Sequence, residues 1–113
     1  MVTGSALGAD VFRAIADPTR RAILDRLRDG GQAVGEIARE FPVSRPAISK
    51  HLRILRKARL VVERREGRSR VYALNPRPLR HLDDWLEEYR AFLRGSLQRL
   101  KERIEAEEND DKE

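Results

Sequence analysis

The stretch VSRPAISKHLRILRKARLVVERREGRSRVYALN, from Val43 to Asn75, decides the fold expected for this chain. Ser44 can cap a helix, and Pro46 is tolerated in the first turn because backbone N–H groups there have no intrahelical acceptor. A helix is therefore expected from Arg45 to about Ala58, with basic side chains opposite an apolar stripe. The stripe consists of Ile48, Leu52 and Leu55. One face of this helix suits a core, and the other suits a partner.

Two strand-like runs, LVVERR and SRVYAL, follow this helix and flank the tripeptide EGR. Because Gly67 permits a tight turn between them, they predict a β-hairpin over residues 61–74. Arginines gather around its tip. The fold class expected is therefore mainly α with a small β-hairpin.

Helical patterns lie on both sides of this stretch. Residues 1–8 look irregular, residues 10–16 and 34–41 suit short helices, and a third helix is expected between a cap at Asp17 and the pair Gly30–Gly31. Apolar residues three or four apart predict one long helix over about 78–106, followed by a frayed acidic tail at 107–113. No repeat or second domain is visible. We expect a single domain over residues 1–113, with its core at about 10–75.

Positive charge is concentrated in the stretch that contains the helix and hairpin. Residues 44–70 carry ten basic and two acidic side chains, whereas the other 86 residues carry 14 basic and 17 acidic ones. Such segregation is typical of a protein that binds a polyanion, although a solvated basic surface is the simpler alternative. The density of charge favours nucleic acid.

Composition excludes several classes of protein. The 113 residues include no cysteine, so disulfides, thiolate metal ligands and thiol redox switches are absent. The N-terminus lacks the pattern of a signal peptide, and no apolar run is long enough to span a bilayer. No nucleophile with a matching acid–base set is visible, so no enzyme activity and no cofactor are expected. We expect a cytoplasmic protein that does not bind membranes.

The order of elements is that of a winged helix-turn-helix. A helix with short polar side chains at its start can enter the major groove of double-stranded DNA, while a basic hairpin beside it can reach the backbone or the minor groove. Phosphates require cations for affinity, and base edges require donors and acceptors. A protein-interaction module that kept this fold without reading DNA is the rival hypothesis.

Three segments resemble the ArsR family of bacterial transcriptional repressors: FRAIADPTRRAILDRLRDGG, the stretch VGEIAREF through VYALN, and LDDWLEEYRAFLRGSLQRLKE. The resemblance runs from Val11 to about Arg103. It implies a homodimeric winged helix that binds an inverted-repeat operator and represses transcription. The sequence departs from the family at Arg59, where the family often has glycine, and this affects the expected helix end.

The resemblance assigns the DNA contacts residue by residue. Four residues at the start of the recognition helix would approach base edges: Arg45, Pro46, Ser49 and Lys50. Three later cations of the helix would meet phosphates: Arg53, Arg56 and Lys57. The expected DNA-binding set also includes Ser44 and four wing residues that would reach the backbone or the minor groove: Arg64, Arg65, Arg68 and Arg70. His51 lies at the edge of the apolar half, where it could touch a phosphate or pack against a preceding helix.

A metal-sensing member of the family is an alternative, because relatives use cysteines or His and acidic residues as ligands. Here only His81, Asp84 and Glu88 share a face of the last helix. A single histidine among carboxylates is more often a solvated helix start, and acidic residues there favour the helix dipole. No metal site is therefore expected, and the inducer is left unknown.

The last helix has a wider apolar surface than a small domain needs. In the resembled family this helix and the first one build the dimer, although packing within one chain is the alternative. The expected dimer contacts are Val11, Phe12, Ile15, Leu82, Trp85, Leu86, Tyr89, Phe92 and Leu93.

Overall fold

The computed structural model of the chain describes the backbone of residues 2–111 and the side chains of residues 8–110. The chain divides into two compact units, with the boundary between Leu82 and Asp83. The first unit holds four helices, a small sheet and the start of a fifth helix, and the second consists of the rest of that helix.

The first two helices meet at a turn in which arginines satisfy backbone groups. Helix α1 spans Val2–Ile15, so the irregular start expected for residues 1–8 is wrong from Val2 onward. Helix α2 spans Pro18–Leu27, and the Asp17 carboxylate accepts the N–H of Arg20 at 3.0 Å. The guanidinium of Arg20 donates to the carbonyl oxygens of Ala14 (2.7 Å) and Arg13 (2.9 Å). These bonds occupy carbonyls at the end of α1 that have no helical partner.

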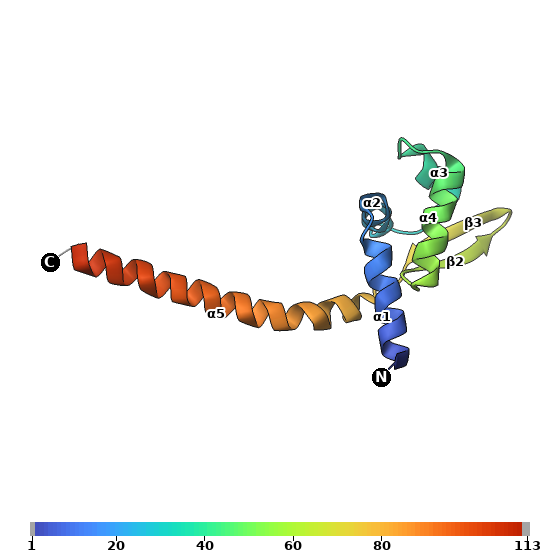
Figure 1. The fold of residues 1–113 in the computed structure, drawn as a ribbon. Coiled ribbons are helices and arrows are strands. Elements are labelled where there is room, and N and C mark those ends of the chain that lie inside the picture. The colour runs from blue at the N-terminus through green and yellow to red at the C-terminus, as the bar shows by residue number, and fades with distance from the viewer. Residues whose placement is uncertain (1, 112–113) are drawn as a thin grey trace. The chain divides into compact units, whose positions relative to one another are not determined.

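Helices α3 (Val34–Arg39) and α4 (Arg45–Lys57) pack against each other, and α4 also contacts α1, α2 and strand β2 (Figure 1). The cap of α4 is the predicted one, because the Ser44 hydroxyl accepts the N–H of Ala47 at 3.2 Å. The predicted stripe faces inward, and all its side chains are fully buried: Ile48, Leu52 and Leu55. The exposed face of α4 is therefore left to polar and basic residues.

The hairpin strands β2 (Val61–Glu66) and β3 (Ser69–Leu74) pair antiparallel, with Val61 opposite Leu74. Gly67 in the turn has a φ of 63°, which favours glycine. The short strand β1, Gln32–Ala33, pairs with the other edge of β3, so the sheet has the order β1-β3-β2. The sequence predicted only the β2–β3 hairpin. Strand β1 has just two residues, which are too few to show the alternation of apolar and polar side chains that indicates a strand.

The core of the first unit is built from every one of its helices. Its fully buried side chains include Val11 of α1, Ile23 of α2 and Ile37 of α3, alongside the stripe of α4. Tyr72 and Leu79, the first residue of α5, pack against this cluster. Burial of these side chains fixes the position of α4 within the first unit, so the residues on its outward face are held in a defined place.

Helix α4 ends in a Schellman motif that contains an unfavourable residue. The N–H of Leu60 reaches the carbonyl of Leu55 (3.0 Å) and that of Arg59 reaches Arg56 (2.9 Å), the pairing that defines this motif. Arg59 takes a φ of 63°, a left-handed conformation that glycine adopts without strain. The side chain of Asn75 donates to the Arg59 carbonyl at 2.8 Å and helps to hold it. The departure from glycine therefore leaves the helix end intact.

Replacing this arginine by glycine should stabilise the protein. We expect Arg59→Gly to raise the free energy of unfolding by about 0.5–1 kcal/mol, because relief of the left-handed strain exceeds the entropy that glycine gains when unfolded. Chemical denaturation of the parent and the variant measures the difference. Gly67→Ala is the matched opposite change, since it introduces a side chain at the same φ, and it should destabilise the hairpin. A destabilised Arg59→Gly variant would contradict the expectation.

The last helix, α5, spans Leu79–Asp111, five residues beyond the predicted end at 106. Residues 112 and 113 of the predicted acidic tail lie outside the described residues. In the second unit Arg90 pairs with Asp83 and Glu87, both at 2.8 Å, and this raises the pKa of its guanidinium. One face of the helix carries an apolar stripe: Trp85, Tyr89, Phe92, Leu93, Leu97, Leu100 and Ile104.

This face, called the α5 stripe below, has no other element within its unit to cover it. Its large side chains are exposed by between 48% (Ile104) and 68% (Phe92). The rings of Trp85 and Tyr89 contact each other in a tilted arrangement, with centroids 4.8 Å apart and an interplanar angle of 52°. Across residues 2–111, no helix is both long and apolar enough to cross a membrane.

Candidate nucleic-acid interface

The outward face of α4 carries the residues expected to approach base edges. Arg45, Pro46 and Lys50 are exposed, and Ser49 is half-buried. Further along the helix, Arg53, Arg56 and Lys57 are exposed as well. The structure therefore gathers these side chains on one surface, with the buried stripe on the other side of the helix.

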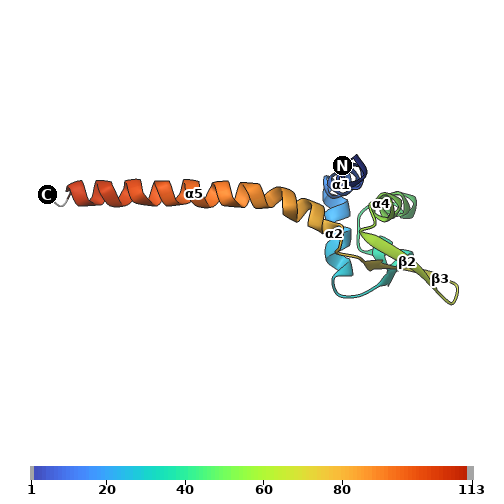
Figure 2. The ribbon, with the colours of Figure 1, turned by 90° about the horizontal axis from the view of Figure 1, so that it is seen from below.

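The wing is the β2–β3 hairpin, and its arginines are all exposed: Arg64, Arg65, Arg68 and Arg70. Arg65 and Arg70 face each other across the two strands. In both Figure 1 and Figure 2 the turn of the hairpin lies on the side of the first unit away from α1 and α2. The wing thus extends the basic surface beyond α4.

A hollow of about 610 Å³ connects the start of α4 with the wing. Arg45 of α4 and Arg68 and Arg70 of the wing line it, together with residues 33–36 and Ser69. Arg39, in the last turn of α3, lines it too, although it is not among the DNA contacts expected from the sequence. Its only signal in the sequence is a basic side chain near the turn before α4. Four guanidinium groups around one open hollow suit the phosphates of a DNA backbone.

Glu63 joins the recognition helix to the wing. Its carboxylate, only 16% exposed, accepts a hydrogen bond from Arg56 of α4 (2.9 Å) and lies 3.6 Å from the Nε of Arg70. The hydroxyl of Tyr72 donates to the same carboxylate at 3.2 Å. Burial, followed by the nearby Glu63 charge, raises the pKa of Tyr72 above its usual value. Arg56 and Arg70 are therefore held in place before any ligand binds.

The comparisons with known proteins agree with this geometry. A family model described as a helix-turn-helix domain matches residues 15–64. The HTH-type transcriptional regulator Rv2034 of Mycobacterium tuberculosis is 53% identical over 78 residues, which cover 69% of this chain and 73% of that protein. The transcriptional repressor SdpR of Bacillus subtilis is 44% identical over 77 residues, which cover 68% of this chain and 86% of that protein.

Solved structures are similar as well. The homodimeric winged helix-turn-helix DNA-binding domain of Mb0332 from Mycobacterium bovis matches with a TM-score of 0.62 and 29% identity, over 76% of this chain and 80% of that one. Other matching structures are those of ArsR-family and ArsR-like transcriptional regulators.

The chain belongs to the ArsR family. The resemblance predicted from the sequence is thereby confirmed, as is the winged helix-turn-helix fold. The protein is a DNA-binding transcriptional regulator and not an enzyme. DNA is therefore the partner of this protein, and the basic surface on α4 and the wing is the candidate contact.

His51 takes the packed alternative rather than the phosphate contact. Its Nδ1 lies 3.2 Å from the guanidinium of Arg20 and 3.9 Å from the Asp17 carboxylate. The hydrogen bond from the N–H of Arg20 lowers the pKa of Asp17 below its usual value. In this ArsR-family protein, His51 therefore ties the recognition helix to the start of α2.

Metal sensing, the alternative within the ArsR family, would depend on His81 with Asp84 and Glu88. His81 is half-buried beside Gly8 of α1, whereas Asp84 and Glu88 are exposed. Among the described residues, no three His, Asp or Glu side chains come together as a candidate metal site.

The residues expected at an ArsR-type dimer contact divide into three groups. Val11 is fully buried in the core of its own chain, so its place in the expected contact was wrong. Phe12, Ile15, Leu82 and Leu86 are half-buried. Trp85, Tyr89, Phe92 and Leu93 are exposed, and they share the α5 stripe with three residues outside the expected set: Leu97, Leu100 and Ile104.

Proposed function

We propose that this protein is a homodimeric repressor that binds an inverted-repeat operator in double-stranded DNA. The observation that carries the proposal is one continuous basic surface, which runs from the start of α4 through the arginine-lined hollow to the wing. In each protomer α4 lies in the major groove, and the wing follows the adjacent backbone. The SdpR relative, itself a transcriptional repressor, supports repression as the outcome.

Base edges are read by the start of α4. Arg45 and Lys50 donate to guanine, Ser49 donates or accepts, and Pro46 offers apolar contact to a thymine methyl. The phosphates are met by Ser44 and by basic side chains of α4 and the wing: Arg53, Arg56, Lys57, Arg64, Arg65, Arg68 and Arg70. Arg39 joins this second group, because it lines the same hollow as Arg45.

The dimer is formed through the α5 stripe. The exposed apolar side chains of the stripe support this role, and the Mb0332 domain, which is homodimeric, is a precedent of the same fold. A twofold dimer presents two recognition helices, which explains why the operator is an inverted repeat. The chain acts as one domain, with its DNA-reading core at about 10–75, and it works in the cytoplasm.

Selection of bound fragments from a genomic library tests this function directly. We expect the recovered sites to share two inverted half-sites whose centres lie about one helical turn apart. Recovery of fragments without a shared site, at the same yield as random DNA, would contradict operator reading.

Affinity for the selected operator should fall steeply as salt rises. Each phosphate met by Lys or Arg releases counterions, so a dimer with six or more contacts loses about 10³-fold in affinity between 50 and 200 mM salt. Fluorescence anisotropy of a labelled operator over a salt series measures the slope. A flat response would contradict a binding surface built mainly on phosphate contacts.

A further inference from the structure

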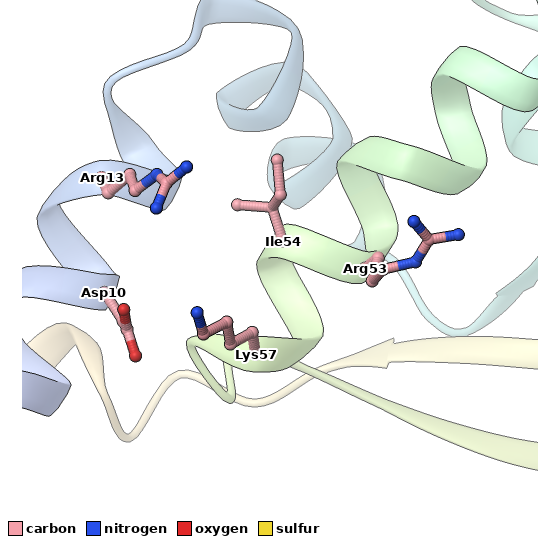
Figure 3. A pocket seen from close by; sticks show the side chains of 5 residues that line it. All are labelled: Asp10, Arg13, Arg53, Ile54 and Lys57. Carbon is pink, nitrogen blue, oxygen red and sulfur yellow. The ribbon is translucent and has the colours of Figure 1, made fainter.

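A second, smaller hollow lies between α1 and α4 (Figure 3). Its volume is about 150 Å³, and Asp10, Arg13, Arg53, Ile54 and Lys57 line it. All five belong to the first unit. The hollow therefore sits beside the recognition helix, on the side where α1 packs.

The hollow is cationic around an apolar floor. Figure 3 shows the guanidinium of Arg13 directed toward Ile54, and the Lys57 side chain rising from α4 on the side that faces α1. Ile54 itself packs against the core. Within the described part of the chain, neither Arg13 nor Lys57 forms a side-chain hydrogen bond or ion pair. Asp10, one turn before Arg13, is the single acidic residue among the lining side chains.

The hollow adjoins the surface already assigned to DNA. Lys50, Arg53 and Lys57 are spaced three and four residues apart, so they follow one exposed side of α4. Arg53 also lines the hollow, but Figure 3 shows its guanidinium directed away from α1. Lys57 is thus the last cation of the row, and Arg13 continues the row onto a different helix.

We propose that Arg13 and Lys57 form a binding site for one phosphate of the DNA backbone, which makes α1 part of the nucleic-acid interface. The inference rests on the proposed docking of α4 in the major groove. Two cations from separate helices can approach one phosphate from two sides with charge-assisted hydrogen bonds. The apolar floor beneath them removes competing hydrogen-bond partners, and the size of the hollow suits a single oxyanion rather than a base.

The experiment replaces Arg13 by glutamine and titrates the full-length dimer with operator and with unrelated duplex DNA over a salt series. Loss of one phosphate contact per protomer should lower affinity by about 10- to 100-fold at 0.1 M salt, equally for both DNAs. The slope of log affinity against log salt should become shallower by about 2 for the dimer. Asp10→Asn removes the opposing charge, so it should raise affinity for both DNAs.

Arg28→Gln is the matched control. Arg28 is an exposed arginine at the end of α2, its side chain forms no hydrogen bond or ion pair with residues 8–110, and the change in net charge is the same. It should leave the salt slope unchanged. Thermal unfolding and sedimentation should show that all variants keep the fold and assembly state of the parent.

Two outcomes would contradict the proposed phosphate site while leaving operator binding by the parent protein established. If Arg13→Gln matches Arg28→Gln in affinity and slope, the hollow binds no phosphate. If Arg13→Gln instead weakens the operator more than unrelated DNA, Arg13 reads bases, and the phosphate assignment is wrong. Loss of operator binding by the parent protein itself would instead contradict the proposed function.

Discussion

Replacing Leu93 and Leu97 by glutamate should convert the protein into monomers and lower its operator affinity by about 10³-fold or more. Both side chains lie on the α5 stripe, where they are 56% and 55% exposed in the single chain. If the stripe is the dimer contact, each substitution places two carboxylates in one apolar interface. The second half-site is then no longer bound intramolecularly, and the gain from effective concentration, about 10²–10⁴-fold, disappears.

The size of this effect follows from the apolar area involved. Full burial of one leucine side chain is worth about 1.5–3 kcal/mol, and a symmetric interface contains every stripe residue twice. Burial of a carboxylate without a partner further reduces the free energy of dimerisation. The loss from two substitutions per protomer should therefore exceed the favourable free energy contributed by the remaining stripe residues. Sedimentation velocity measures the assembly state, and anisotropy measures the affinity.

The control places the same charges on the other side of the same helix. Ala91 and Gln98 are exposed and lie roughly opposite the stripe at 100° per residue. The variant Ala91→Glu with Gln98→Glu should remain dimeric and bind the operator, with a modest loss from added negative charge. An intact dimer in the Leu93 and Leu97 variant would show that the stripe does not hold the protomers together.

Local patterns predicted the recognition helix and the wing well. The cap at Ser44, the apolar stripe of α4 and the turn at Gly67 each depend on residues within a few positions of one another. Helix periodicity and turn chemistry are therefore sufficient to predict them. The same reasoning placed the basic face of α4 correctly, because a buried stripe leaves only the opposite arc for solvent.

Features that depend on distant contacts were missed. Strand β1 forms only because β3 offers it an edge, and the Glu63 carboxylate joins residues of a helix and two strands. Arg39 joins the basic surface only because the fold brings the end of α3 to the same hollow as the wing. Val11 was expected at the dimer contact because the resemblance implies that the first helix joins the dimer, but the resemblance does not say which apolar residues of that helix are buried within their own chain.

Replacing Arg45 and Lys50 together by alanine should lower operator affinity by about 10³-fold or more and abolish most of the preference for the operator. A bidentate contact to a base edge is worth about 1–3 kcal/mol, and the dimer would lose four of them. Both side chains are exposed on α4, whose buried face they do not touch, so the fold should persist. Affinity for unrelated DNA should fall less, because only the electrostatic part of these contacts is lost there.

The matched variant, Arg65→Ala with Arg68→Ala, removes two positive charges from the wing instead. If the wing meets the backbone, this variant should weaken operator and unrelated DNA by similar factors and leave the ratio between them almost unchanged. Both double variants lose the same net charge, so both should bind DNA more weakly. The ratio of operator affinity to random-DNA affinity is therefore the quantity that distinguishes base reading from backbone binding. Competition between labelled operator and unlabelled random duplex measures that ratio directly. A parental ratio in the Arg45 and Lys50 variant would mean that the start of α4 does not read bases, and sequence preference would then have to come from the wing or from the shape of the DNA.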